Sequence, residues 1–152
     1  MQYYEIEHFH INKDTLPVLG DQTFRAKLAD AIYIIPKDIL DDALSNCVFL
    51  MLSEEKGVSA CFIPKQLITE KSMFAFYDMF YSQNRDQQGH MILHEIAHYV
   101  LDHSDEGLSD EDYYNHKQDK EANALVDKWI DDWEKHLKAL EEKTMKPWKG
   151  GD

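Results

Sequence analysis

Residues 92–103 read ILHEIAHYVLDH and contain the pattern H-E-x-x-H. Apolar residues around the pattern recur at helical spacing, so we expect a helix that starts near Arg85 or Gln88 and continues to about Asp102. Histidines four positions apart lie on the same face of a helix, one turn above the other. Their imidazoles are therefore placed to bind one metal ion, and zinc is the usual occupant of such a pair.

The residue that follows the first histidine gives the pattern its chemistry. On a helical wheel with His94 at 0°, His98 lies at about 40° and Glu95 at about 100°, whereas the apolar side chains fall between about 200° and 340°. Glu95 is thus expected beside the metal, where a carboxylate acts as general base on a metal-bound water. We predict His94 and His98 as metal ligands and Glu95 as the catalytic residue.

A hydrolytic zinc site also needs a third protein ligand and an open position for water. Glu121 is the leading candidate, because it opens the last predicted helix beside the small residues Ala122 and Ala124, which let two helices approach closely. His103 falls at about 180° on the wheel, so it cannot reach the metal if the helix continues through it. Asp102 lies on the correct side but about two turns from His94, and it suits a supporting role behind the ligands. The residues alone leave other acidic positions open: Asp105, Glu106, Asp110, Glu111 and Asp119.

The first half of the sequence alternates predicted strands and short helices. The clearest β signal is a pair of apolar runs within residues 47–64, which flank a polar turn as in a hairpin. The other predicted elements are strands over residues 2–11 and 31–35, and helices over residues 21–30 and Asp38–Ser45, the last with Asp38 as N-cap.

The second half reads as helical. The aromatic stretch 72–82 has undecided periodicity, the acidic stretch 103–118 predicts a loop, and residues 119–143 predict the last helix. That helix carries apolar residues on one face: Ala122, Leu125, Val126, Trp129, Trp133, Leu137 and Leu140. We expect one α+β domain over residues 1–146, with a small antiparallel sheet beside a helical core, and a frayed tail over residues 147–152.

Charge and composition exclude several classes of function. The 152 residues include 29 acidic and 16 basic side chains, a net charge of −13, which argues against binding nucleic acid or an anionic membrane through a basic surface. The N-terminal residues lack the regions of a secretory signal, and the longest apolar stretch, Cys47–Leu52, is too short to span a bilayer. Cys47 and Cys61 lie in apolar runs and are expected to be reduced and buried. We expect a cytoplasmic protein.

The H-E-x-x-H helix, the acidic segment after it and the sequence KEANALVDKW at residues 120–129 together resemble the ImmA/IrrE family of metallopeptidases. Members of that family join the H-E-x-x-H helix to a Glu some two dozen residues later, in a helix of the E-x-x-A-N or E-A-N type. The resemblance is close over about residues 85–130 and implies a small sheet before the active-site helix.

The resemblance also implies roles for individual residues. His94, His98 and Glu121 would be ligands of Zn²⁺, and Glu95 would be the general base. The implied substrate is a protein, a helix-turn-helix transcriptional repressor, often encoded on a phage or other mobile element. Independently of the resemblance, a zinc peptidase needs a donor for the oxyanion of its intermediate, and three residues between the ligand segments could supply one: Tyr113, Tyr114 and His116. For each of them alone, an exposed loop residue without such a role is the favoured interpretation.

Two hypotheses follow from the sequence. The leading one is a zinc-dependent endopeptidase that cleaves a cytoplasmic protein. The alternative is a non-catalytic, acidic, zinc-containing protein that binds and sequesters a repressor by imitating the charge of DNA. The two differ in whether the predicted metal keeps an open position and whether Glu95 moves a proton.

Overall fold

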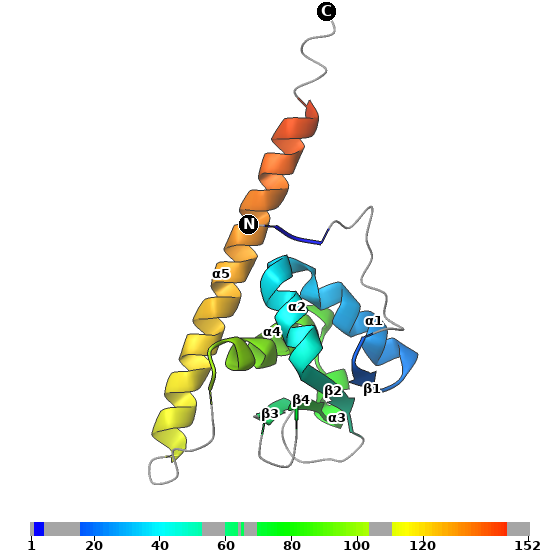
Figure 1. Cartoon of the computed structure of the whole chain (residues 1–152), viewed down its shortest axis with the longest axis vertical. Helices are drawn as coiled ribbons and strands as arrows, with labels where there is room; N and C mark the ends of the chain where they lie inside the picture. Colours follow the sequence, from blue (N-terminus) through cyan, green and yellow to red (C-terminus); the bar gives the residue numbers. More distant parts are fainter. Residues whose placement is uncertain are drawn as a thin grey trace, which may run out of the picture.

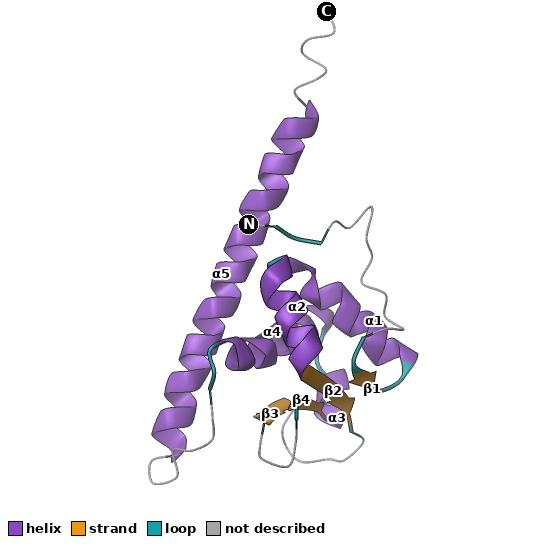
Figure 2. Ribbon diagram, in the orientation of Figure 1, coloured by secondary structure: helices purple, strands orange, loops and turns teal. Residues whose placement is uncertain are grey.

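The computed structural model describes residues 2–4, 16–52, 60–63, 65, 70–103 and 111–145. In chain order the elements are β1 (Val18–Leu19), α1 (Gln22–Ala31), the 3₁₀ helix η2 (Ile32–Ile34), α2 (Lys37–Asn46), β2 (Cys47–Met51), β3 (Ala60–Ile63), β4 (Ser72–Phe76), α3 (Asp78–Tyr81), α4 (Arg85–Val100) and α5 (Glu111–Met145). Most of the described residues are helical (Figure 2), and the predicted α+β class is confirmed.

The four strands form one small mixed sheet in the order β1-β2-β4-β3. β2 pairs parallel with β1 and with β4, so that Cys47 lies opposite Ser72. β3 pairs antiparallel with β4, and Phe62 lies opposite Phe74. The sheet is therefore small, as expected, but mixed and not antiparallel.

The two apolar runs of residues 47–64 do not form the predicted hairpin. β4 lies between β2 and β3, so the two runs share a sheet without being neighbours. β2 reads CVFLM and is apolar at every position. Such a continuous run is typical of a strand inside a parallel sheet. A hairpin with one face exposed to solvent instead alternates apolar and polar residues.

Helices α1, α2 and α4 cover the sheet and enclose an aromatic core (Figure 1). The ring of Phe24 on α1 lies 5.1 Å from that of Phe76 on β4 and 5.8 Å from that of Phe80 on α3. All three rings are fully buried, as are Phe49 and Phe74 on the adjacent strands. Apolar residues of α4, among them Ile92 and Ile96, belong to the same core, so α4 packs directly on it.

The start of α4 is fixed by a capping box. The Asn84 side chain accepts from the Gln87 backbone N–H at 2.9 Å, and the Gln87 side chain accepts from the Asn84 N–H at 3.2 Å. One turn on, buried Gln88 accepts from Lys27 of α1 at 2.6 Å and donates to the Phe80 carbonyl at 3.1 Å. These bonds fix the orientation of α4 about its own axis. They therefore determine which way His94 and His98 face.

Helix α5 runs along one side of the molecule, and its last part extends beyond the other elements (Figure 1). It has 35 residues, a length of about 52 Å at 1.5 Å per residue. Ala122, Val126 and Trp129 are buried against the body, whereas Leu137 and Leu140 are exposed. The predicted apolar face is therefore buried in its first half and exposed beyond it.

The N-terminal segment lies against the middle of α5. The ring of Tyr3 contacts Trp133 at 5.1 Å and His136 at 4.6 Å between centroids. Residues 2–4 are not in a strand, and the rest of the strand predicted over 2–11 lies outside the described residues.

Three other predictions need correction. The stretch 31–35 forms the end of α1 and a 3₁₀ turn, not a strand. Pro36, not Asp38, is the N-cap of α2, and Asp38 lies in its first turn. The loop predicted over 103–118 is helical from Glu111 onward.

The tail at 147–152 lies outside the described residues. In the described part of the chain, no helix combines the length and apolar character needed to cross a membrane.

Candidate metal centre

The two histidines of the H-E-x-x-H pattern meet at the edge of α4. The Nε2 atoms of His94 and His98 lie 3.0 Å apart. The inner face of the helix is anchored by buried apolar residues, among them Ile92, Ile96 and Ala97, which leaves the two imidazoles on its flank facing α5. Their side chains are 17 % and 11 % exposed, so the pair is close to the surface without being fully solvated.

Asp119 on α5 completes a group of three ligand atoms. Its Oδ1 lies 3.2 Å from Nε2 of His94 and 3.2 Å from Nε2 of His98. The three atoms form a nearly equilateral triangle. In a tetrahedral zinc site with bonds of about 2.0 Å, ligand atoms lie about 3.3 Å from one another. The two imidazoles and the carboxylate therefore fit zinc in both chemical type and spacing.

The carboxylate is the most exposed member of the group. The Asp119 side chain is 55 % exposed. Among the side chains that the structure describes, the group comprises His94, His98 and Asp119. Three protein ligands leave a tetrahedral ion one further position, which is the arrangement of a catalytic zinc site.

Each histidine is held from behind by a second hydrogen bond. The Nδ1 atom of His94 lies 2.8 Å from the amide oxygen of Asn123, one turn along α5 from Asp119. Because that oxygen only accepts, Nδ1 of His94 is the donor. The Nε2 atom of a neutral His94 ring then carries a lone pair toward the other two ligand atoms.

His98 is held by a second histidine. Its Nδ1 lies 2.8 Å from Nδ1 of His103, and Nε2 of His103 lies 2.8 Å from a carboxylate oxygen of Glu121. A carboxylate only accepts, so His103 donates from Nε2 and, when neutral, accepts at Nδ1. His98 therefore donates from Nδ1, and its Nε2 is also free of a proton.

The turn after α4 explains how His103 reaches His98. Asp102 has a positive φ of 57°, the left-handed conformation that often follows the end of a helix. The Asp102 N–H bonds to the Tyr99 carbonyl at 3.0 Å, and the His103 N–H bonds to the His98 carbonyl at 2.9 Å. The chain thus reverses at Asp102 and brings the His103 ring back under His98.

The carboxylate of Glu95 is buried next to this group. Its residue is 7 % exposed. Burial, and secondarily the negative charge of Asp119, raises the pKa of Glu95 to about 8. Burial also lowers the pKa of His98 to about 4, with the neighbouring His94 and His103 adding to the effect. His98 is therefore a neutral imidazole near pH 7, the form that binds metal.

The structure brings together most of the predicted site residues, with one exchange. His94, His98 and Glu95 lie together as expected, and Asp119 occupies the position that we predicted for Glu121. The two acidic residues are two positions apart on α5, or about 200° around the helix, so they face different ways. Glu121 contacts His103 and Lys117, with Lys117 Nζ at 4.0 Å.

The sequence held a signal for Asp119. Read from Ala122 and Asn123, the E-x-x-A-N spacing places its acidic residue at position 119, whereas the E-A-N spacing places it at 121. Asp119 also lies four residues before Asn123, on the same helical face, and both contact His94. The E-x-x-A-N spacing is therefore the one that matches the observed contacts.

His103 is not one of the three ligand atoms, in agreement with its place on the wheel, but it contacts the ligand candidate His98, which a continuous helix would not allow. The helix ends at Val100, and the left-handed turn carries His103 to the other side. Asp102, expected to support the ligands, instead lines a separate pocket. The predicted oxyanion candidates Tyr113, Tyr114 and His116 have side chains that lie outside what the structure describes.

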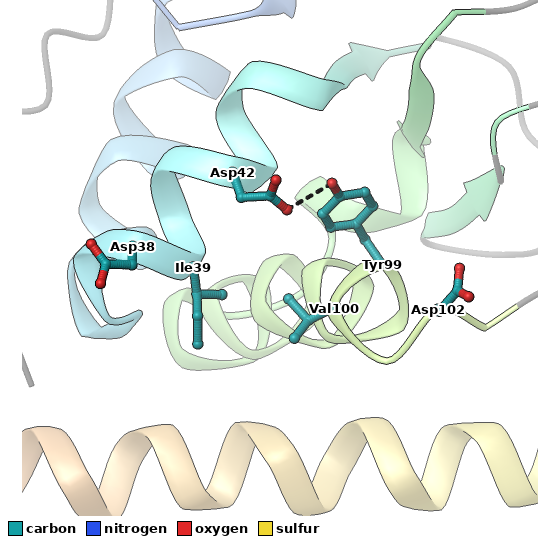
Figure 3. Close-up of a pocket in the computed structure, with 6 residues that line it drawn as sticks. All are labelled: Asp38, Ile39, Asp42, Tyr99, Val100 and Asp102. Atoms are coloured by element: carbon teal, nitrogen blue, oxygen red, sulfur yellow. Dashed lines mark hydrogen bonds between the residues drawn. The ribbon is translucent and has the colours of Figure 1, made fainter.

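That pocket lies between α2 and the end of α4 (Figure 3). It measures about 400 Å³ and is lined by Asp38, Ile39, Asp42, Tyr99, Val100 and Asp102. The Tyr99 hydroxyl donates to the Asp42 carboxylate at 2.8 Å. This bond ties α2 to the last turn of α4.

No protein-family model, curated protein or solved structure matches this chain. The interpretation of the site therefore depends on its geometry and on the sequence pattern.

Proposed function

We propose that this protein is a zinc-dependent endopeptidase. The observation that carries the proposal is the triangle of His94 Nε2, His98 Nε2 and Asp119 Oδ1, with sides of 3.0, 3.2 and 3.2 Å. Two imidazoles and a carboxylate are the ligand types of hydrolytic zinc sites, and the buried carboxylate of Glu95 lies beside them. In this proposal Asp119, and not Glu121, is the third ligand.

In the proposed hydrolysis, a bound ion and Glu95 have separate roles. A zinc ion, when bound, supplies Lewis-acid polarisation of a peptide carbonyl and lowers the pKa of water to about 7. Glu95 accepts a proton at its carboxylate from the attacking water and gives it to the nitrogen of the leaving amine.

The proposed substrate is a protein, and the resemblance to the ImmA/IrrE family suggests a helix-turn-helix transcriptional repressor. The net charge of −13 supports this class, because a DNA-binding protein presents a basic surface and opposite charges favour encounter. We propose that the protein acts in the cytoplasm, where such a repressor works.

The experiment is to replace Glu95 by Gln, which keeps the shape of the side chain and leaves the three ligands in place. Parent and Glu95→Gln are incubated with the helix-turn-helix protein encoded nearest to the gene and with unfolded casein, and the products are analysed by intact mass spectrometry. We expect zinc content to be unchanged and cleavage to fall by at least about 10²-fold. Glu134→Gln, an exposed change on α5, is the matched control and should cleave like the parent.

The alternative hypothesis makes the opposite prediction. A sequestering protein would leave the repressor whole in every sample, and parent and Glu95→Gln would relieve repression equally in cells. That result would reject the peptidase proposal. Cleavage by Glu95→Gln at the parent rate would instead reject Glu95 as the general base.

A further inference from the structure

Behind the metal ligand His98 lies a chain of two hydrogen bonds that ends on a carboxylate. His98 Nδ1 contacts His103 Nδ1 at 2.8 Å, and His103 Nε2 contacts Glu121 Oε2 at 2.8 Å. The three residues come from the end of α4, the turn after it and α5. The His103 side chain is only 8 % exposed, so its ring is held by these bonds and is little exposed to water.

The two ligand histidines have different supports. His94 is backed by the neutral amide of Asn123 at 2.8 Å. His98 is backed by a second imidazole that is itself bonded to an anion. A negative charge behind a donor histidine raises the basicity of its metal-facing nitrogen, and a hydrogen bond at the other nitrogen fixes the ring's tautomer and orientation.

The backbone turn after α4 adds a second link between the two residues: the left-handed conformation of Asp102 lets the His103 N–H donate to the His98 carbonyl at 2.9 Å. His98 and His103 are thus linked through both backbone and side chains. The ring of Phe62 on β3 lies parallel to that of His98, with 8° between their planes and 6.4 Å between centroids. The His98 ring is therefore bounded by Phe62 as well as by His103.

We propose that His103 and Glu121 are positioning residues for the metal centre: Glu121 orients His103, and His103 holds His98 with Nε2 unprotonated and aimed at the metal. The inference depends on the proposed function only through the metal site, and it holds whether or not the protein cleaves a peptide. Glu121 then acts two hydrogen bonds behind the ligand His98, and it is not itself the ligand that the sequence suggested.

The test measures zinc affinity by competition with a chromophoric chelator. We expect His103→Phe, which keeps an aromatic ring but no acceptor, to bind zinc about 10–100-fold more weakly than the parent. His103→Asn should recover most of this loss, because an amide oxygen accepts from His98 just as Asn123 accepts from His94. Glu121→Gln should cost less than His103→Phe, since its amide oxygen still accepts but carries no charge.

Nuclear magnetic resonance gives a readout that a loss of packing alone would not change. In the zinc-loaded parent, the Nδ1 proton of His98 should be visible and shifted by its bond to His103. In His103→Phe that proton should exchange with water and disappear, and in His103→Asn it should return. Circular dichroism on each variant establishes that it is folded before its affinity is measured.

Three outcomes separate the possibilities. A parent that binds no zinc would reject the metal site, and the proposed function with it. A parent that binds zinc while His103→Phe and Glu121→Gln bind it equally well would reject the positioning role alone. If Glu121→Gln lost as much zinc affinity as Asp119→Asn, Glu121 would itself be a ligand. That result would also reject the positioning role of His103 and Glu121.

Discussion

The Nε2 atoms of His94 and His98 lie 3.0 Å apart, and both face one carboxylate oxygen of Asp119. The outer nitrogens of the two rings are both engaged as donors, so two lone pairs and an anionic oxygen converge on the same small volume. A cation between them removes the repulsion. This electrostatic arrangement is the physical basis of the predictions about metal binding.

The first prediction concerns zinc stoichiometry. The purified protein should hold about one Zn²⁺ per chain. His94→Ala, His98→Ala or Asp119→Ala should each abolish or greatly weaken zinc binding, because a site with two protein ligands in place of three has a much lower affinity for the ion. Elemental analysis and isothermal titration are the measurements.

The matched control for these variants is His90→Ala. His90 lies on α4 one turn before His94 but lines a different pocket, together with Lys27 and Asp30 of α1. It should bind zinc like the parent. Equal zinc uptake by Asp119→Ala and the parent would transfer the third ligand to another residue.

The second prediction concerns the turn at Asp102. Its φ of 57° is costly for most side chains, and more so for β-branched ones. Asp102→Gly should be neutral or stabilising by up to about 1 kcal/mol, whereas Asp102→Val should destabilise by about 1–2 kcal/mol. Because the turn delivers His103 to His98, Asp102→Val should also weaken zinc binding.

Urea unfolding and zinc titration on the same samples measure both effects. Asp102→Asn is the control, since Asn also tolerates the left-handed region and should match the parent. A Val variant with parental stability would mean that the turn is not left-handed in solution.

The third prediction compares two alanines on α5. Ala122 is fully buried among the core residues between α4 and α5, whereas Ala124 is exposed. Ala122→Leu should destabilise by about 1–3 kcal/mol through overpacking and should displace Asp119 from the two histidines. Ala124→Leu should change neither stability nor zinc affinity appreciably. Thermal unfolding with and without zinc distinguishes the two, and similar effects for both would contradict the helix orientation.

The fourth prediction concerns Cys47. The residue is fully buried in β2, and burial, with a further contribution from Asp42, raises the pKa of its thiol to about 12. The unfolded thiol titrates near 9.0, so between pH 9 and 12 the unfolded chain loses a proton that the folded chain keeps. This thiol therefore makes stability fall as pH rises through that window, by at most about 1.4 kcal/mol per pH unit.

The same burial should protect Cys47 from alkylation. In a Cys61→Ser background, Cys47 is the one cysteine left in the sequence. Iodoacetamide at pH 9 should label it slowly in the native protein and fully in guanidinium chloride, as intact mass shows. Rapid labelling of the native form would contradict its burial.

Much of the helical part of the fold followed from local signals in the sequence. The sequence predicted that α4 starts near Arg85 or Gln88, and the capping box of Asn84 and Gln87 sets the start at Arg85. Asp21 similarly caps α1 by accepting from the Phe24 N–H at 2.8 Å. Caps and helical period depend on residues a few positions apart, so a single sequence reveals them.

The sheet could not be predicted in the same way, because pairing depends on distant segments. The polar stretch after β2 suggested a hairpin with β3, yet β4 pairs with both strands. The run at 31–35 was too short and too uniformly apolar for its period to separate a strand from a 3₁₀ turn. The acidic residues near 110 suggested a loop, although acidic side chains also stabilise the first turn of a helix such as α5.

At the site, the paired histidines followed from helix geometry alone. The choice between Asp119 and Glu121 did not, because it depends on the rotation of α5 about its axis. That rotation is set by the burial of Ala122, Val126 and Trp129 against the body of the protein. The contact between His98 and His103 depends on a single backbone turn that no helical wheel represents.

The origin of the three ligand atoms in two separate helices has a consequence for chain entropy. His94 and Asp119 are 25 positions apart in the sequence, so an ion that joins them closes a loop in the chain. In an unfolded chain, closing a loop of this length costs about 3 kcal/mol, a cost that the folded protein has already met by packing α5 on α4. Zinc should therefore act as a reversible cross-link: its removal by a chelator should lower the melting temperature and raise hydrogen exchange first in the amides of α5 around Asp119, while the sheet keeps its protection.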